Sequence, residues 1–251
     1  NPTYRLLKEW ATSAKARKRD QVTLLEGRRL ILGFAQSGGR ARFLVTAESS
    51  QQVAVGDSPL GMIDADQHVV LADSLFDNLS DVKTSQGVLA VTSIPIPAPW
   101  PTGGETVVLL EDIQDPGNLG SIIRSAAGAG VGYIGLSAGC ASAWSPKVVR
   151  AGMGGHFHLA IHEGMDLPAV IGALSIPVVA TAPEAEESLY QAELGRAVAW
   201  LFGNEGNGLS ERLLSAVGWR LRIPMAAGNE SLNVAAAVAI CLFEQNRQRS
   251  L

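Results

Sequence analysis

The side chains best suited to polar chemistry lie in three loops, the first of which follows a predicted strand over Thr106–Leu110. Asp115 and Pro116 are typical of a helix N-cap and a first helical residue, so a helix is predicted to begin there. A helix N-terminus offers free N–H groups to an anion, and Arg124 adds a planar cation that suits a phosphate. Asn118 lies six residues before Arg124, about 240° around a helix, so the two meet only if Asn118 lies in a bent entry turn. A capped helix with an exposed arginine is the plain alternative.

The second loop, Gly203-Asn204-Glu205-Gly206-Asn207-Gly208, follows an apolar run. Glycine and asparagine tolerate positive φ, so this loop can present bare backbone to a ligand. Glu205 is the only charged residue in it. A tight turn with a solvated glutamate would explain the same residues.

The third loop runs from Ile223 to Asn233 and precedes a long apolar helix predicted over Leu232–Gln248. Ser231 can cap that helix. Asn233 near the helix start is costly as a core residue and useful as a ligand contact. A simple serine N-cap remains the other interpretation.

The elements that must position these loops alternate between strand-like and helix-like runs, which is typical of an α/β domain with a parallel sheet. Predicted helices cover Leu119–Ala129, Lys147–Ala151 and Leu232–Gln248. Predicted strands cover Thr106–Leu110, Tyr133–Leu136, Phe157–Ile161, Pro177–Thr181 and Ala197–Phe202.

The N-terminal part reads as a second, smaller α/β domain. It has predicted helices at Leu6–Arg19 and Leu24–Gln36 and predicted strands at Phe43–Thr46 and Gly87–Val91. Residues 94–104 contain four prolines and two glycines, which excludes a helix or a central strand. We therefore expect a small domain over residues 1–94, a semi-rigid linker over 95–104 and a larger domain over 105–251.

Composition limits the class of protein. The chain has 251 residues, of which 47% are hydrophobic, so it is not a disordered polymer. Its mean hydropathy is +0.16, and no run of about 18 uncharged apolar residues predicts a membrane span. Its two cysteines, Cys140 and Cys241, form no disulfide framework or zinc spacing. A reducing, cytoplasmic setting is expected.

Charge is unevenly distributed. Residues 1–42 hold ten Lys or Arg and three acidic residues, a net charge of +7. Because the whole chain has a net charge of −4, the remaining residues carry −11. Such a basic arm predicts a polyanionic partner, although a solvated helix face is an equal explanation. Its strongest cluster is Arg17-Lys18-Arg19, and Arg28 follows it closely.

Two motifs mislead. Residues Gly130 to Gly135 match G-x-G-x-x-G, but they follow a predicted helix and enter a strand, the reverse of a dinucleotide-binding turn. Gly128 and Gly130 are instead typical of helix C-caps. Three histidines, His156, His158 and His162, would share one face of a strand, but no cysteine or well-placed carboxylate completes a metal site, so none is predicted.

Taken together, the order and spacing of the three loops resemble the SpoU (TrmH-like) branch of the SPOUT RNA methyltransferases. The resemblance rests on the segments that begin at Asn118, Gly203 and Ile223, and it covers nearly the whole chain. Residues 1–2, 25–27 and 84–91 are similar to the L30e-like RNA-binding domain of that family. One departure is Ala235-Ala236, where the family often has a serine.

This resemblance implies a fold, a reaction and a site. It implies an L30e-like domain followed by a parallel sheet with a C-terminal trefoil knot, a rare exception to normal threading. It implies methyl transfer from S-adenosylmethionine to an RNA ribose 2′-OH in a homodimer, without a metal. The implied catalytic candidates are Asn118, Arg124, Glu205, Ser231 and Asn233. The implied cofactor residues are Thr181, Ala182, Gly203, Asn204, Gly208, Ile223, Met225, Ser231 and Leu232. The expected RNA contacts are Arg17, Lys18, Arg19, Arg28 and Arg124.

The chemistry suits these residues. The ribose hydroxyl is a weak acid that must lose its proton near transfer. Arg124 is a poor base, because the pKa of a guanidinium exceeds about 12, but it can bind the adjacent phosphate and align the hydroxyl. The L30e-like domain favours rRNA over tRNA, since it suits a structured RNA element. A catalytically silent RNA-binding protein and a base methyltransferase are the rival interpretations.

Overall fold

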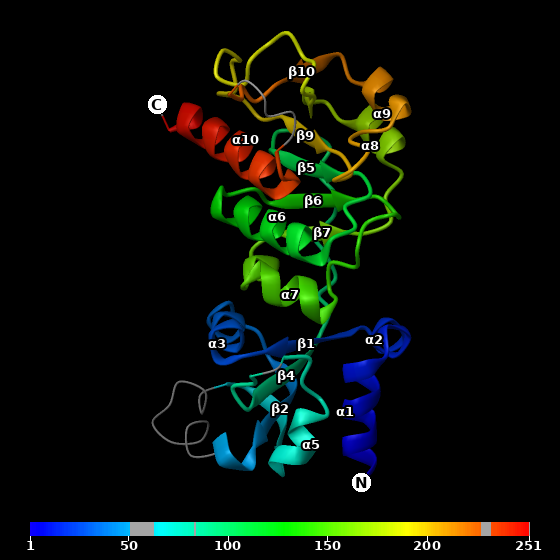
Figure 1. Cartoon of the computed structure of the whole chain (residues 1–251), viewed down its shortest axis with the longest axis vertical. Coiled ribbons are helices and arrows are strands. Elements are labelled where there is room, and N and C mark those ends of the chain that lie inside the picture. The colour runs from blue at the N-terminus through cyan, green and yellow to red at the C-terminus, as the bar shows by residue number, and fades with distance from the viewer. Residues whose placement is uncertain (51–62, 83, 227–231, 251) are drawn as a thin grey trace. The chain divides into compact units, whose positions relative to one another are not determined.

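The computed structural model describes residues 1–50, 63–82, 84–226 and 232–250. The chain forms two compact units (Figure 1). Unit 1 comprises Asn1–Ile96 and Trp144–Phe157, and unit 2 comprises Pro97–Ala143 and His158–Leu251. Each unit contains a β-sheet and its own helices, so the α/β class predicted from the sequence is confirmed for both.

Unit 1 is built on a four-stranded mixed sheet with strand order β1-β4-β2-β3. Strands β2 and β3 are parallel, and β4 pairs antiparallel with both β1 and β2. The predicted strands near residues 43–46 and 87–91 are confirmed within β2 and β4. The bounds are β1 Val22–Glu26, β2 Ala41–Ala47, β3 Ala65–Leu71 and β4 Val88–Ser93.

The predicted helix over Leu24–Gln36 is wrong at its start. Leu24 and Leu25 belong to β1, and only Arg28–Gln36 forms a helix, α3. Gly27 separates the two with a φ of 98°, a conformation that favours glycine. The apolar run of β1 is buried on both faces of the sheet, and periodicity alone cannot distinguish such a strand from a buried helix.

The predicted single helix over Leu6–Arg19 is two helices, α1 Pro2–Thr12 and α2 Ala14–Asp20. Ser13 interrupts them with extended backbone, and its side chain accepts a hydrogen bond from the backbone N–H of Ala16. A serine in this position is a good N-cap and a poor interior helical residue, so it begins a new helix.

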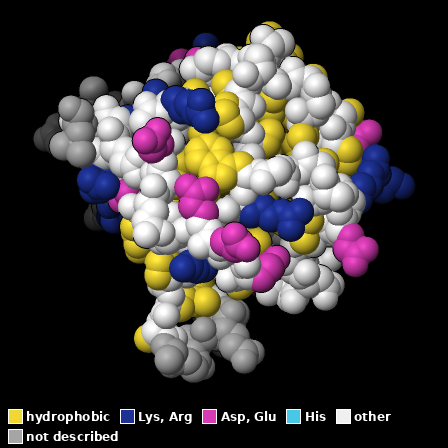
Figure 2. All heavy atoms as spheres, turned by 90° about the horizontal axis from the view of Figure 1, so that it is seen from above, with side chains coloured by type: hydrophobic (Ala, Val, Ile, Leu, Met, Phe, Trp, Pro, Cys, Tyr) yellow, Lys and Arg dark blue, Asp and Glu magenta, His cyan; other side chains and the backbone are white. Residues whose placement is uncertain are grey.

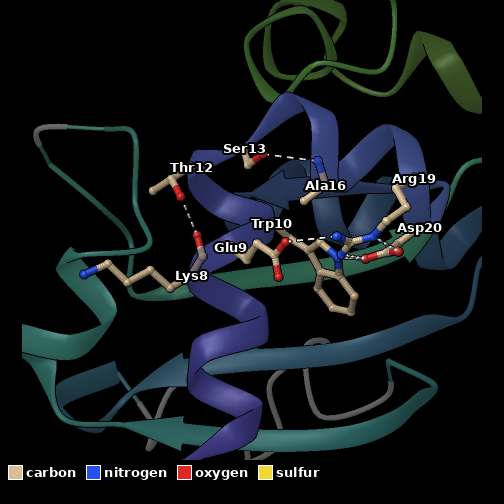
Figure 3. Close-up of polar contacts among 8 residues, drawn as sticks. All are labelled: Lys8, Glu9, Trp10, Thr12, Ser13, Ala16, Arg19 and Asp20. Atoms are coloured by element: carbon tan, nitrogen blue, oxygen red, sulfur yellow. Dashed lines mark hydrogen bonds and ion pairs between the residues drawn. The ribbon is translucent and has the colours of Figure 1, made fainter.

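The basic cluster at the end of α2 is partly used inside unit 1. Arg17 donates from Nη1 to the carbonyl oxygens of Trp10 and Ala11, at 2.7 and 3.3 Å. Arg19 pairs with Glu9 at 3.1 Å and with Asp20 at 2.7 Å (Figure 3). Two of the three basic side chains in this cluster therefore have intramolecular partners.

Asp20 closes this arrangement between α1 and α2. Its carboxylate accepts hydrogen bonds from Arg19 and from the indole N–H of Trp10, the latter at 2.7 Å. The hydrogen bond from Arg19 is the main cause that holds the pKa of Asp20 well below its usual range. Lys8, by contrast, points away from the cluster (Figure 3).

Helices cover both faces of the unit 1 sheet. On one face, Leu7 and Trp10 of α1 and Phe76 of α5 (Asp73–Asp77) share a core with β-strand residues. On the other, α3 and α7 (Pro146–Gly152) contact β1.

Residues 144–157 thus pack with unit 1, although the sequence places them within the larger domain. Their backbone reaches the sheet directly, since Thr23 Oγ1 donates to the Trp144 carbonyl at 2.7 Å.

Unit 2 is built on a six-stranded, wholly parallel sheet with order β10-β8-β9-β5-β6-β7. The parallel sheet predicted from the alternating runs is confirmed. The predicted strand Phe157–Ile161 begins too early, because Phe157 ends a short 3₁₀ turn. The bounds are β5 Val107–Leu110, β6 Tyr133–Leu136, β7 Ala160–His162, β8 Val178–Thr181, β9 Ala199–Phe202 and β10 Trp219–Leu221.

Two pairs of helices cover this sheet. Helices α8 (Leu167–Ala173) and α9 (Glu211–Ala216) share an apolar core with one face, which includes Val107 and Leu109. Since strand residues alternate between faces, Val108 and Leu110 face the opposite side. There α6 (Pro116–Gly128) contacts α10 (Val234–Arg249) (Figure 1).

A buried glutamine fastens α10 to the sheet. Gln245 accepts a hydrogen bond from the indole N–H of Trp200 at 2.8 Å and donates to Thr106 Oγ1 and the Arg196 carbonyl, at 3.1 and 2.8 Å. Buried side-chain amides are costly unless they are bonded in this way. The bonds therefore fix the position of α10, and with it the start of α10 at the third loop.

The proline-rich segment has no regular secondary structure, and from Pro97 onward it packs on unit 2. Trp100 contacts the ring of His162 edge-on, with 5.2 Å between centroids. His162 Nε2 lies 2.9 Å from the Ala98 carbonyl oxygen. These contacts hold the segment from Pro97 onward against the unit 2 sheet.

The misleading glycines have structural roles. Gly130 follows α6 with a φ of 75°, and the N–H groups of Gly130 and Val131 bond back to the carbonyls of Ala127 and Ala126. This is the Schellman arrangement, which confirms the predicted C-cap at Gly130. Gly128, also expected as a cap, is the last helical residue.

Three further expectations concern the chain as a whole. None of the helices in the described ranges combines the length and hydropathy needed to cross a bilayer. Within those same ranges, no three His, Cys, Asp or Glu side chains are arranged to hold a metal ion. The trefoil knot stays a prediction, because residues 227–231 on its expected path lie outside the described residues.

Candidate active site

The first and second loops meet because their strands are neighbours. Strands β5 and β9 pair in parallel, with Leu110 opposite Phe202, so the loops that follow them leave the same edge of the sheet. Ligand sites of open parallel sheets lie outside the carboxyl ends of the strands. Glu111 fixes the two loops to each other, since its carboxylate accepts from the backbone N–H of Ser210 at 2.7 Å.

Helix α6 begins where the sequence predicts. Asp115 is its N-cap, with Oδ1 accepting from the backbone N–H of Asn118 at 2.8 Å, and Pro116 is the first helical residue. Asn118 is the third residue of the helix, so its side chain projects from the first turn. That placement directs it toward the second loop.

Glu205 receives several donors from this region. Its carboxylate accepts from the backbone N–H groups of Gln114 and Asp115, at 3.3 and 3.1 Å, and from the side-chain amide of Asn118, at 3.1 Å. The second loop is thereby held against the start of α6. The glutamate of the second loop is therefore an acceptor satisfied by the protein itself.

The charge of Glu205 is stabilised in place. Partial burial on its own raises the pKa of this carboxyl. The hydrogen bonds from its own backbone N–H, from Asn118 and from the residues before α6 outweigh that effect, so the pKa lies below the ordinary value. Glu205 consequently remains ionised at neutral pH and keeps its bonds.

Asn233 joins the same network from the third loop. It is the N-cap of α10, and its Oδ1 accepts from the backbone N–H groups of Ala235 and Ala236, at 3.0 and 3.2 Å. Its Nδ2 donates to Asn118 Oδ1 at 2.9 Å. The sequence reasoning assigned this cap to Ser231, which lies outside the described residues.

The two asparagine amides have only one consistent orientation. Two backbone N–H groups require an oxygen at Oδ1 of Asn233, so its Nδ2 faces Asn118 and the facing atom of Asn118 is the acceptor. The Asn118 Nδ2 then donates to the Glu205 carboxylate, which can only accept. Each amide nitrogen keeps a second N–H with no partner in the part of the chain that the structure describes.

The second loop is a compact backbone turn. Asn204 and Gly208 exchange two backbone hydrogen bonds of 2.9 Å each. The Asn204 side chain accepts from the N–H groups of Gly206 and Asn207 and donates to the Asp112 carbonyl at 2.8 Å. Asn204, expected to bind the cofactor, thus uses its side chain to shape the loop.

Gly203 is required by close packing. A Cβ atom at this position would lie 2.2 Å from the carbonyl carbon of Gly208 and 2.3 Å from the nitrogen of Leu209. Both are backbone atoms, which cannot move aside without opening the loop.

A pocket of about 380 Å³ lies against this loop, within the size range of small-ligand sites. Eight of the nine predicted cofactor residues line it, and the ninth, Ser231, lies outside the described residues. These eight are Thr181, Ala182, Gly203, Asn204, Gly208, Ile223, Met225 and Leu232. Their role in binding a cofactor remains a proposal, but they surround a single cavity.

The pocket also has walls that the sequence reasoning missed. Phe202, Leu209, Leu214 and Leu221 supply apolar surface, and Pro183 and Glu184 extend the end of β8. Leu214 lies on α9 and Leu221 on β10, two elements that the alternating pattern did not predict. Of these missed residues, only Pro183 and Glu184 had a signal in the sequence, because they directly follow a predicted strand.

Arg124 stands apart from the network. It is exposed on α6 and has no hydrogen bond or ion pair with any residue that the structure describes. Asn118 and Arg124 lie about 240° apart around the helix, so they point in different directions. The structure therefore brings together Asn118, Glu205 and Asn233, and leaves Arg124 free to meet a ligand.

Comparison with known proteins fits this geometry. The family model described as the SpoU rRNA Methylase family matches residues 105–243, more than half of the chain. The chain belongs to that family. Its match covers both the α6 region and the glycine loop that the structure holds together.

Two curated relatives extend the likeness over nearly the whole chain. A Synechocystis protein named as an uncharacterised tRNA/rRNA methyltransferase is 32% identical and covers 99% of this chain and 92% of its own length. A 23S rRNA guanosine 2′-O-methyltransferase of Bacillus subtilis is 28% identical, with 94% of each chain covered.

A solved structure has the same architecture. The rRNA methyltransferase of Sinorhizobium meliloti, bound to S-adenosylmethionine, is 30% identical and superposes with a TM-score of 0.81. It covers 98% of this chain and 95% of its own. The SpoU family uses S-adenosylmethionine, and the cavity beside the glycine loop has the volume and the mixed polar and apolar walls that suit it.

Substituting Gly203 tests whether the loop shapes the pocket. Gly203→Ala should abolish binding of S-adenosylhomocysteine in calorimetry, because the new Cβ would collide with the backbone of Gly208 and Leu209. Gly206→Ala is the matched control, since its Cβ would lie 3.5 Å from the nearest atom, an ordinary contact with Asn204. Equal affinities of the two variants would contradict the assigned pocket.

Proposed function

We propose that this protein methylates a ribose 2′-hydroxyl of ribosomal RNA. Its membership of the SpoU family makes it an S-adenosylmethionine-dependent RNA 2′-O-methyltransferase. The finer assignment to rRNA is supported by the names of the Bacillus subtilis and Sinorhizobium meliloti relatives. The observation that carries the proposal is the hydrogen-bonded set of Asn118, Glu205 and Asn233 beside a pocket of cofactor size.

The residues divide into binding and positioning roles. S-adenosylmethionine supplies an electrophilic methyl group, so the protein has mainly to orient and activate the hydroxyl. Glu205 is a positioning residue, because its carboxylate orients Asn118, which in turn is held by Asn233. The remaining N–H groups of the two amides are donors available to ribose oxygens.

Arg124 is the group that we assign to the RNA backbone. Its exposed guanidinium has no partner among the described residues, and it can bind a phosphate through two parallel hydrogen bonds. A phosphate held in this way would fix the neighbouring ribose and align its 2′-oxygen for transfer. The intact network argues against a catalytically silent RNA-binding protein, which would have no need of it.

The basic arm offers fewer phosphate contacts than its composition suggests. Arg17 and Arg19 are engaged within unit 1, and Arg28 is half-buried at the start of α3. Lys15 and Lys18 are exposed one turn apart on α2, and we assign the phosphate contacts of the arm to them. On the face formed by unit 2, Lys and Arg are interspersed with Asp and Glu instead of gathering in one patch (Figure 2).

The C-terminal helix supplies an apolar surface that suits a homodimer. Ala236, Ile240 and Phe243 lie on one side of α10, at the spacing of successive turns. Phe243 is 49% exposed, and the other two are only partly buried. We infer that a second copy of this chain covers them.

Both cysteines are free thiols, which supports a reducing, cytoplasmic location.

Arg124 variants test the reaction. Arg124→Ala and Arg124→Lys should both lose methyl transfer to rRNA by at least about a hundredfold, because lysine lacks the planar fork, while S-adenosylhomocysteine affinity stays unchanged. Transfer of labelled methyl to purified rRNA and, separately, to tRNA measures this. Arg212→Ala, an exposed arginine on α9, is the control. Near-full turnover by Arg124→Lys would contradict the phosphate role, and transfer to tRNA alone would contradict the rRNA assignment.

Paired variants on α2 separate RNA binding from stability. Replacing Lys15 and Lys18 with alanine should flatten the log–log salt dependence of RNA affinity by roughly one to two units and leave urea unfolding unchanged. Arg17→Ala should instead lower the free energy of unfolding by about 1–2 kcal/mol, because two carbonyls at the end of α1 lose their donor. An unchanged salt slope in the double lysine variant would remove α2 from the RNA surface.

A charge on α10 tests the dimer. Phe243→Glu should shift the protein from dimer to monomer in sedimentation velocity, since a buried, unpaired carboxylate is costly at an apolar interface. Leu75→Glu makes a similar change at a residue of unit 1 that is 40% exposed, and it should remain dimeric. A monomeric wild-type protein, or a dimeric Phe243→Glu variant, would show that this surface has another purpose.

A further inference from the structure

Among the described residues, two carboxylates line the pocket, and they differ in what they contact. Glu205 is engaged by the α6 region, as described above. Glu184 is exposed, and it makes no hydrogen bond or ion pair with any residue in the described ranges. Of the two described carboxylates, Glu184 is therefore the one that remains available to a ligand.

The strand order places Glu184 away from the reacting groups. Asn118 and Glu205 follow β5 and β9, whereas Glu184 follows β8, on the opposite side of β9. Neighbouring strands are about 4.8 Å apart. Glu184 therefore follows a strand that β9 separates from β5, the strand that leads to Asn118.

The surface between these two ends is largely apolar. Phe202 lies at the end of β9, Leu221 ends β10, and Ile223 follows it. Such walls suit the flat face of a purine base, and a single polar group at the edge suits the sugar attached to it. The pocket thus combines apolar walls with a carboxylate at its border.

A carboxylate is well matched to a ribose diol. Its two oxygens accept hydrogen bonds and donate none, and neighbouring hydroxyls can each donate one. Acidic side chains bind ribose hydroxyls in this way in dinucleotide sites. We propose that Glu184 accepts hydrogen bonds from the ribose hydroxyls of the adenosine of S-adenosylmethionine, and so selects a ribonucleoside cofactor. This assignment rests on the proposed function.

Calorimetry on the full chain tests the assignment without measuring methyl transfer. The ligands are S-adenosylmethionine, S-adenosylhomocysteine and the 2′-deoxy and 3′-deoxy analogues of S-adenosylhomocysteine. Glu184→Ala should weaken both natural ligands by about tenfold, the size expected for lost hydrogen bonds to a charged group. The loss should be equal for the two, because they share one ribose and differ in the charge on sulfur.

The deoxy analogues identify the atoms involved. Wild-type protein should bind at least one analogue about tenfold more weakly than S-adenosylhomocysteine, and Glu184→Ala should bind all three with similar affinity. Glu184→Gln keeps one acceptor and should be intermediate. Glu186→Gln, an exposed neighbour that does not line the pocket, is the control. Thermal unfolding midpoints should be the same for all four proteins.

Three results would overturn the assignment. Unchanged affinity in Glu184→Ala would show that Glu184 does not contact the cofactor. A larger loss for S-adenosylmethionine than for S-adenosylhomocysteine would show that Glu184 acts on the sulfonium charge. Equal discrimination against the deoxy analogues by wild type and variant would place the ribose elsewhere. Failure of the S-adenosylmethionine-dependent reaction on which the assignment rests is distinct, because wild-type protein would then bind neither natural ligand.

Discussion

The carboxylate of Glu205 holds the candidate site together. It links the loop after β9 to the backbone before α6 and, through Asn118, to the start of α10. The carboxylate is exposed, and its donors from Gln114, Asp115 and Asn118 all belong to the segment that begins α6. Asn118 in turn accepts from Asn233, so one continuous series of hydrogen bonds joins the three loops. The same hydrogen bonds stabilise the ionised carboxylate and so lower the pKa of Glu205.

The parallel sheet makes this arrangement possible. Because β8, β9 and β5 are neighbours, the segments after them leave the same edge and border one cavity. The glycine loop then contributes shape more than side chains, since Gly203 permits contact between backbones that a Cβ would prevent. Gln245 maintains the geometry from the far side by fixing α10 against β9 and β5. The site is thus supported by buried polar bonds as well as by apolar packing.

Unit 1 shows how a charge pattern can serve two purposes. Its arginines look like a uniform basic surface, yet Arg17 satisfies carbonyls at the end of α1 and Arg19 bridges acidic side chains. The exposed lysines of α2 have no such structural partners among the described residues and are strongly hydrated point charges. An RNA-binding surface assigned from composition alone would therefore include arginines whose hydrogen bonds and ion pairs stabilise unit 1. It would overestimate the number of side chains available to phosphates.

The sequence by itself determined the α/β class, most strands of unit 2, its helices α6 and α10 and the residues of the three loops, because periodicity and capping are local properties. It misassigned the second half of β1, from Leu24, as helix, since a strand buried on both faces lacks the alternation that identifies it. It also missed the place of residues 144–157 in unit 1. Only the tertiary structure decided which donors meet Glu205, that Asn233 caps α10, and that Glu184 borders the pocket. Those facts depend on which strands are neighbours, and pairing between distant strands leaves no periodic trace in the chain.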